Sequence, residues 1–155
     1  MIKTVGVYSL TQEVNTAQGL NEFSEEEYLL AEGAGIRRVL EDEKFFNAIN
    51  VQFAANPWDS IMIASTKGKI YKISLQFNSR NKRLARTVLR TTLAFVNQQI
   101  GKYNEHPFLS NKYVWDTTEG NIILYRISSF EIHSVNIFFT SSIIRDQMQK
   151  IIGAT

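Results

Sequence analysis

Short turns separate the strand-like segments of this sequence, and that spacing restricts the fold more than any other feature. The expected strands are residues 4–8, 61–64, 70–77, 112–117, 121–127 and 130–140. Residues 66–69 form a tight turn in which Gly68 can adopt a positive φ. Parallel strands need a crossover connection of about a dozen residues or more, so these neighbouring segments are expected to pair antiparallel.

Helical patterns occupy the remaining segments. Ser24 followed by Glu27 forms a capping-box pattern at the start of a helix that runs to about residue 32. A second helix is expected over 35–48, a long one over 80–100 that Gly101 ends, and a short one after Ser141. The fold class is therefore α+β, with an antiparallel sheet of about five to six strands and helices packed on one face. Residues 1–155 are expected to form a single globular domain.

The charges are segregated along the chain. Residues 60–104 contain nine basic side chains and no acidic one, whereas residues 11–59 contain ten acidic and three basic side chains. The net charge of +2 hides this polarity. Separation of charge in the sequence becomes an electrostatic field in space, and such a field selects partners.

The long helix carries the strongest functional lead. Arg83, Arg86 and Arg90 fall within about 60° of one another on the side opposite its apolar half. Lys67 and Lys69 in the preceding turn add to this basic surface. Three interpretations remain open: the arginines face water or the protein's own acidic helices, they bind an acidic protein surface, or they bind nucleic-acid phosphates.

Two tryptophans are further interface candidates. Trp58 and Trp115 each stand directly before an aspartate at a predicted strand. Tryptophan commonly packs at the edge of a core, and it also serves as an anchor in protein interfaces when its ring is exposed. Both residues would have to be partly exposed on one face for the second role.

Patterns for catalysis, cofactors and metals are missing. The chain has no cysteine, so it has no thiolate metal site, disulfide or cysteine nucleophile. Its histidines, His106 and His133, are expected in a loop and on a strand surface. There is no Gly-x-Ser-x-Gly motif, and the glycines at 33 and 35 match neither nucleotide-binding fingerprint. No catalytic residue, cofactor or metal is therefore assigned.

These observations predict a non-enzymatic protein-interaction module of the inhibitor, adaptor or immunity-protein kind, whose partner has an acidic surface. The predicted interaction residues are Lys67, Lys69, Arg83, Arg86, Arg90, Trp58 and Trp115. The alternatives are a nucleic-acid-binding domain that uses the same helix, and an enzyme of unrecognised type.

The sequence has no run of 18 apolar residues and no cleavage site after its first strand, so we expect no membrane partner and a cytoplasmic location. The oligomeric state does not follow from the sequence.

Overall fold

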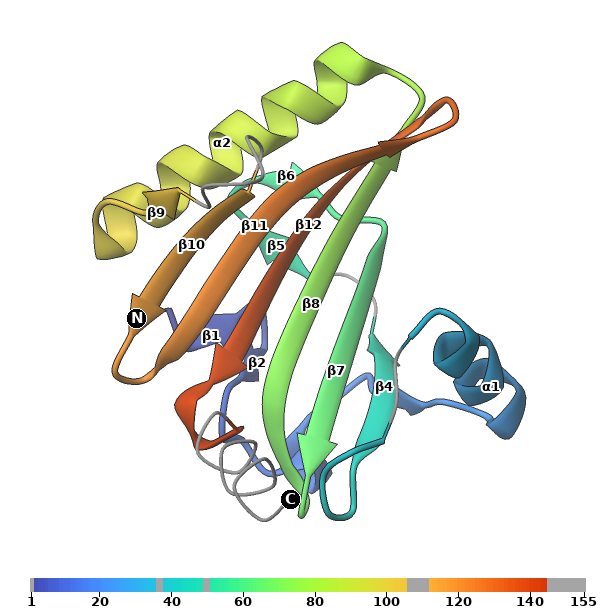
Figure 1. Cartoon of the computed structure of the whole chain (residues 1–155). Coiled ribbons are helices and arrows are strands. Elements are labelled where there is room, and N and C mark those ends of the chain that lie inside the picture. The colour runs from blue at the N-terminus through green and yellow to red at the C-terminus, as the bar shows by residue number, and fades with distance from the viewer. Residues whose placement is uncertain (1, 36–37, 49–50, 106–111, 145–155) are drawn as a thin grey trace, which may run out of the picture.

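A computed structural model describes residues 2–35, 38–48, 51–105 and 112–144. Within these residues, the strands of the main sheet are β3 (Asn21–Glu22), β4 (Lys44–Ala48), β7 (Ser60–Thr66), β8 (Lys69–Ser79), β9 (Asn104–Glu105), β10 (Lys112–Thr117), β11 (Gly120–Ser129) and β12 (Ile132–Ser141). The order across this 8-stranded sheet is β3-β4-β7-β8-β12-β11-β10-β9. Every neighbouring pair is antiparallel (Figure 1). The predicted antiparallel arrangement is thus confirmed, in a sheet wider than expected.

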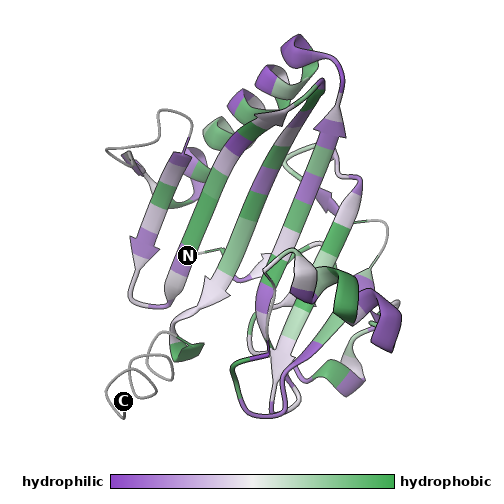
Figure 2. Ribbon diagram, turned by 45° about the vertical axis from the view of Figure 1, so that its right-hand side comes forward, coloured by the Kyte–Doolittle hydropathy of each residue, from purple (hydrophilic) through white to green (hydrophobic). Residues whose placement is uncertain are grey.

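One face of the sheet holds the larger part of the core. The helix α2 (Lys82–Ile100) crosses this face and contacts β8, β11 and β12. Two small hairpins pack on the same core: β1 (Thr4–Val5) with β2 (Tyr8–Ser9), and β5 (Gln52–Phe53) with β6 (Asn56–Pro57). Along the central strands, hydrophobic and hydrophilic residues alternate, as a sheet with two different environments requires (Figure 2). We call the opposite side of the sheet the open face.

The helices do not both pack on one face, as the sequence predicted. The helix α1 (Glu25–Gly33) lies beside the edge of the sheet near β4, far from α2 (Figure 1). Tyr28 is its buried residue and stacks on Phe45 with ring centroids 6.0 Å apart. Phe45 belongs to a smaller apolar cluster on the open face. An acidic helix with a single buried side chain cannot cover a sheet, and therefore α1 remains peripheral.

The helix predicted over 35–48 is also wrong, because residues 44–48 form β4. Phe45 and Phe46 are neighbours in this strand, and both are buried, on opposite faces of the sheet. A strand that is buried on both faces has no polar alternation, and its pattern resembles that of a buried helix segment. Residues 36 and 37 lie outside the described residues.

A β-bulge in β8 changes the face on which one predicted core residue lies. Ala64 pairs with Lys72 and Ser65 pairs with Ile70, so Tyr71 is the extra residue of the bulge. The alternation within 70–77 predicts that Tyr71 and Ile73 share one face of the sheet. Ile73 lies on the α2 side, but Tyr71 joins the cluster on the open face, so the prediction is wrong for Tyr71. The bulge places Tyr71 and Lys72 on the same side of the sheet.

Several local predictions are confirmed by backbone and capping geometry. The Ser24 Oγ accepts a hydrogen bond from the Glu27 backbone N–H, and the Glu27 Oε1 accepts one from the Ser24 backbone N–H, each at 3.1 Å. Lys67 and Gly68 both have positive φ, 51° and 78°, which closes the β7–β8 hairpin as a two-residue turn. Gly101 ends α2 with a φ of 100°.

Other boundaries differ from the predictions. α2 begins two residues later than predicted, because the side chain of Asn81 caps it by accepting from Arg83 N and Leu84 N. The N-terminal strand is divided into the β1–β2 hairpin, where Gly6 has a φ of 62°. Ser141 ends β12, and most of the short helix predicted after it falls in 145–155, outside the described residues.

Candidate functional site

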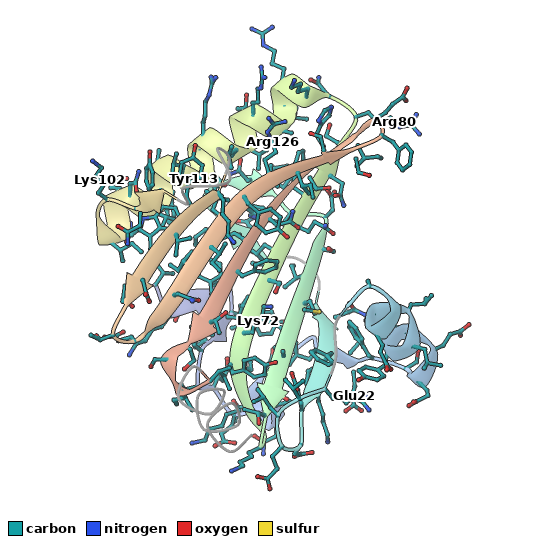
Figure 3. The ribbon with its side chains drawn as sticks, in the orientation of Figure 1. Glu22, Lys72, Arg80, Lys102, Tyr113 and Arg126 are labelled. Carbon is teal, nitrogen blue, oxygen red and sulfur yellow. The ribbon has the colours of Figure 1, made fainter. Side chains whose placement is uncertain are left out.

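Arg83, Arg86 and Arg90 form a basic ridge along the outer side of α2. All three are exposed, while Val88 and Val96 on the opposite side of the helix are buried in the core. In Figure 3, nitrogen-tipped side chains project from α2 away from the sheet. Among the described residues, no carboxylate oxygen lies within 4.0 Å of these guanidinium groups. The acidic helix α1 therefore does not neutralise the ridge.

One residue of the ridge, Arg83, is placed where a positive charge opposes helix stability. The first turn of α2 contains Lys82 and Arg83 and no acidic residue. Basic side chains near a helix N-terminus interact unfavourably with the helix dipole, by about 0.3–1 kcal/mol each when exposed. The same arrangement concentrates positive potential at this end of the helix, which favours an external anionic group.

The two lysines predicted to extend this surface are paired with the protein's own acids. Lys67 Nζ lies 3.3 Å from Glu41 Oε2, and Lys69 Nζ lies 3.9 Å from Glu13 Oε1. Both pairs are solvent-exposed. The acidic segment 11–59 thus balances the β7–β8 turn but leaves the ridge unbalanced. The predicted binding roles of Lys67 and Lys69 remain predictions, although the geometry favours the ridge.

The tip of the β11–β12 hairpin exposes apolar side chains close to the start of α2. We define the hairpin tip as residues 127–132. Phe130 is fully exposed, and Ile127 and Ile132 are 55% and 41% exposed. His133 pairs with Ser79 of β8, two residues before the Asn81 cap, so the tip extends past the β8–α2 junction. Figures 1 and 3 show the tip beside this junction, where Arg80 is labelled.

Phe130 also has an unfavourable backbone conformation. Its φ is 56°, in the left-handed region that favours Gly or Asn at such turns. A bulky residue there is uncommon, and its ring is fully exposed. The sequence predicted that Phe130 begins the strand 130–140, but it lies in the turn between β11 and β12.

The two tryptophans have different environments. Trp115 is 3% exposed, and its Nε1 donates to Asn97 Oδ1 at 3.2 Å and to the Gly101 carbonyl at 3.1 Å. Trp58 is partly buried and donates from Nε1 to the Phe53 carbonyl at 2.9 Å. The condition that both rings be exposed fails for Trp115, which is a core residue, so an interface role for it is not supported.

The described part of the chain brings together few groups suited to catalysis or metal binding. Ser128 Oγ lies 2.7 Å from His133 Nδ1, at the exposed end of the β11–β12 hairpin. No described carboxylate lies within 4.0 Å of this histidine, so the pair lacks the third member of a hydrolase triad. No group of three or more metal-binding side chains occurs among the described residues. His106 lies outside them.

A second cluster of ionisable residues lies on the open face. The Glu43 carboxylate is 6% exposed. Its Oε2 accepts from the backbone N–H groups of Val39, at 2.7 Å, and Leu40, at 2.9 Å, and its Oε1 accepts from the Tyr71 hydroxyl. These contacts fix the 38–43 turn against β8. Because both carboxylate oxygens already accept hydrogen bonds, Glu43 is poorly placed to act as a general base.

Lys72 follows Tyr71 in β8 (Figure 3). Its Nζ sits 4.6 Å from the centre of the Phe138 ring. Burial lowers the pKa of the Lys72 ammonium below its ordinary value of 10.5, and the negative charge of Glu43 opposes this effect. Burial and then the hydrogen bond to Glu43 raise the pKa of the Tyr71 hydroxyl. Perturbed groups that line a cavity together are characteristic of functional sites.

Comparison with known proteins gives no relative from which to transfer a function. No protein-family model matches the chain, and neither a curated protein nor a solved structure matches it. None of the helices in the described ranges is both long and apolar enough to cross a membrane. The proposals that follow are therefore based on the basic ridge with the hairpin tip, and on the cluster of ionisable residues on the open face.

Proposed function

We propose that this protein is a non-enzymatic interaction module, of the inhibitor, adaptor or immunity-protein kind, that binds an acidic surface of a partner protein. The observation that carries this proposal is the exposed ridge of Arg83, Arg86 and Arg90. No carboxylate of a described residue lies within 4.0 Å of these guanidinium groups. Arginine suits such a role because its planar guanidinium can bind a carboxylate through two parallel hydrogen bonds.

The hairpin tip supports a protein partner. Protein interfaces combine a central apolar or aromatic anchor with a polar rim, and they are enriched in Phe and Arg. Phe130 supplies an exposed ring, and Arg80 and Arg83 near the β8–α2 junction supply positive charge beside it. Glu131, in the same turn, would oppose a phosphate backbone, which makes nucleic acid a less suitable partner for this surface.

Affinity capture from the cells that make the protein tests the proposal, followed by titration of the purified partner. The baits are the wild type, the triple variant R83E/R86E/R90E, and the matched reversal K3E/K44E, whose lysines lie outside the predicted interaction residues and have intramolecular acidic partners. We expect the triple reversal to weaken partner affinity by about 100-fold or more, because buried charge pairs at interfaces are sensitive to reversal. The K3E/K44E bait should retain the partner. Equal recovery by the wild type and the triple variant would contradict the proposal.

The nucleic-acid alternative has its own measurement. Duplex DNA and single-stranded RNA are titrated with the wild type at several salt concentrations. A protein that neutralises phosphates shows a logarithmic fall of affinity with salt. Such a slope, abolished in R83E/R86E/R90E, would replace the proposed acidic protein with a nucleic acid. The expected cytoplasmic location is tested separately by cell fractionation.

A further inference from the structure

A cavity of about 380 Å³ lies on the open face, away from the basic ridge. The 38–43 turn, β4, β7, β8 and β12 contribute to its lining. Most of its walls are apolar: Phe45 and Ile144 are buried, and Met62 and Phe138 are partly buried. Its volume falls in the range of about 300–1,000 Å³ that is typical of sites for small molecules.

Lys72 is a partly buried cation in this cavity that forms no ion pair with a described residue. The ion pairs among the described residues do not include it, and its Nζ lies 4.6 Å from the centre of the Phe138 ring. Glu43 lines the same cavity, but its oxygens accept from Val39 N, Leu40 N and the Tyr71 hydroxyl. Partial burial disfavours the charged form of this ammonium group, and an anionic oxygen in the cavity would stabilise that charge.

The charge of the lining limits the ligand. Lys72 is the one cationic side chain among the described lining residues, and Glu43 adds a negative charge nearby. Glu43 would repel a second negative charge on a ligand, which disfavours dianions such as phosphate esters. The apolar walls favour a hydrocarbon body over a sugar or a polar metabolite.

We propose that this cavity binds a small amphipathic monocarboxylate. The carboxylate accepts a charge-assisted hydrogen bond from Lys72 Nζ, and the hydrocarbon body packs against Phe45, Met62 and Ile144. This site is separate from the basic ridge and does not depend on the proposed interaction with a partner protein.

Calorimetric titration of the full chain with octanoate, below its micelle-forming concentration, tests the proposal. The wild type should bind one equivalent saturably. The uncharged analogue octanamide, and octanoate with the variant K72M, should each bind about tenfold more weakly or worse, because the charge-assisted hydrogen bond is lost. The variant K102M removes an exposed lysine elsewhere and should bind octanoate like the wild type.

Backbone amide chemical shifts locate the ligand independently of affinity. Octanoate should shift the amide signals of residues around the cavity, such as Phe45, Met62 and Thr140, and leave those of the basic ridge unchanged. Absence of saturable binding, equal binding by K72M, equal binding of octanamide, or shifts confined to other surfaces would each overturn the proposal. The spectrum of unliganded K72M tests whether the variant remains folded.

Discussion

Replacing Lys72 by methionine should stabilise the protein. Methionine keeps an unbranched stem of similar length in the cavity, so the principal loss is the ammonium group, whose charged form partial burial disfavours. Burying a polar group without full compensation costs about 1–3 kcal/mol in protein mutational data. The contact between Nζ and the Phe138 ring, at 4.6 Å, offsets about 0.5–2 kcal/mol of that cost. The expected net gain from K72M is about 1 kcal/mol at neutral pH.

Urea unfolding followed by circular dichroism measures this gain. For a chain of 155 residues, a gain of about 1 kcal/mol corresponds to a rise in melting temperature of about 2–4 °C. K102M, at an exposed position, should stay within about 0.5 kcal/mol of the wild type. A loss of stability of about 1 kcal/mol or more in K72M would show that Lys72 has a structural role, and would refute the inference that partial burial of its charge is unfavourable.

Three further perturbations test other parts of the structure. Ser24→Ala removes the capping box of α1 and should lower the free energy of unfolding by about 0.5–2 kcal/mol, measured in urea, with no change in cavity binding. The raised pKa of Tyr71 stabilises the folded state below the unfolded pKa of 10.0, and this contribution is lost as pH rises above it. Wild-type stability should therefore fall above pH 10 more steeply than that of Tyr71→Phe, by about 1.4 kcal/mol per pH unit at most; parallel profiles would contradict the assignment. Phe130→Gly fits the positive φ of its turn and should leave the melting temperature unchanged or higher while weakening partner binding; a clear loss of stability would mean that the ring supports the fold.

The sequence predicted the elements whose signals are local. The cap at Ser24, the turn at Lys67–Gly68 and the end of α2 at Gly101 depend on a few adjacent residues, and all three are present. The strand β4 was missed because Phe45 and Phe46 are both buried, which removes the alternation that distinguishes a strand from a helix. Its identity depends on pairing with β3 and β7, which a local pattern does not contain.

The candidate sites also differ in whether their residues are close together in the sequence. The basic ridge follows from helical periodicity and was predicted in place, because Arg83, Arg86 and Arg90 recur at the spacing of one helix face. The pairing of Lys67 with Glu41 joins positions far apart in the chain and had no local signal. The cavity around Lys72 assembles a turn and several strands, so it could not be predicted before the sheet order was known.

The extra residue in β8 suggests how such a cavity could arise in evolution. On one side of the bulge, Ile73 and Leu75 keep their pairing with β7, and on the other side Lys69 keeps its pairing with Thr66. A single-residue insertion at Tyr71 is therefore absorbed locally, without a change in the packing beneath α2. Insertion or deletion of a single codon could add or remove Tyr71, whose hydroxyl binds Glu43. The hydrophobic core beneath α2 would keep its packing.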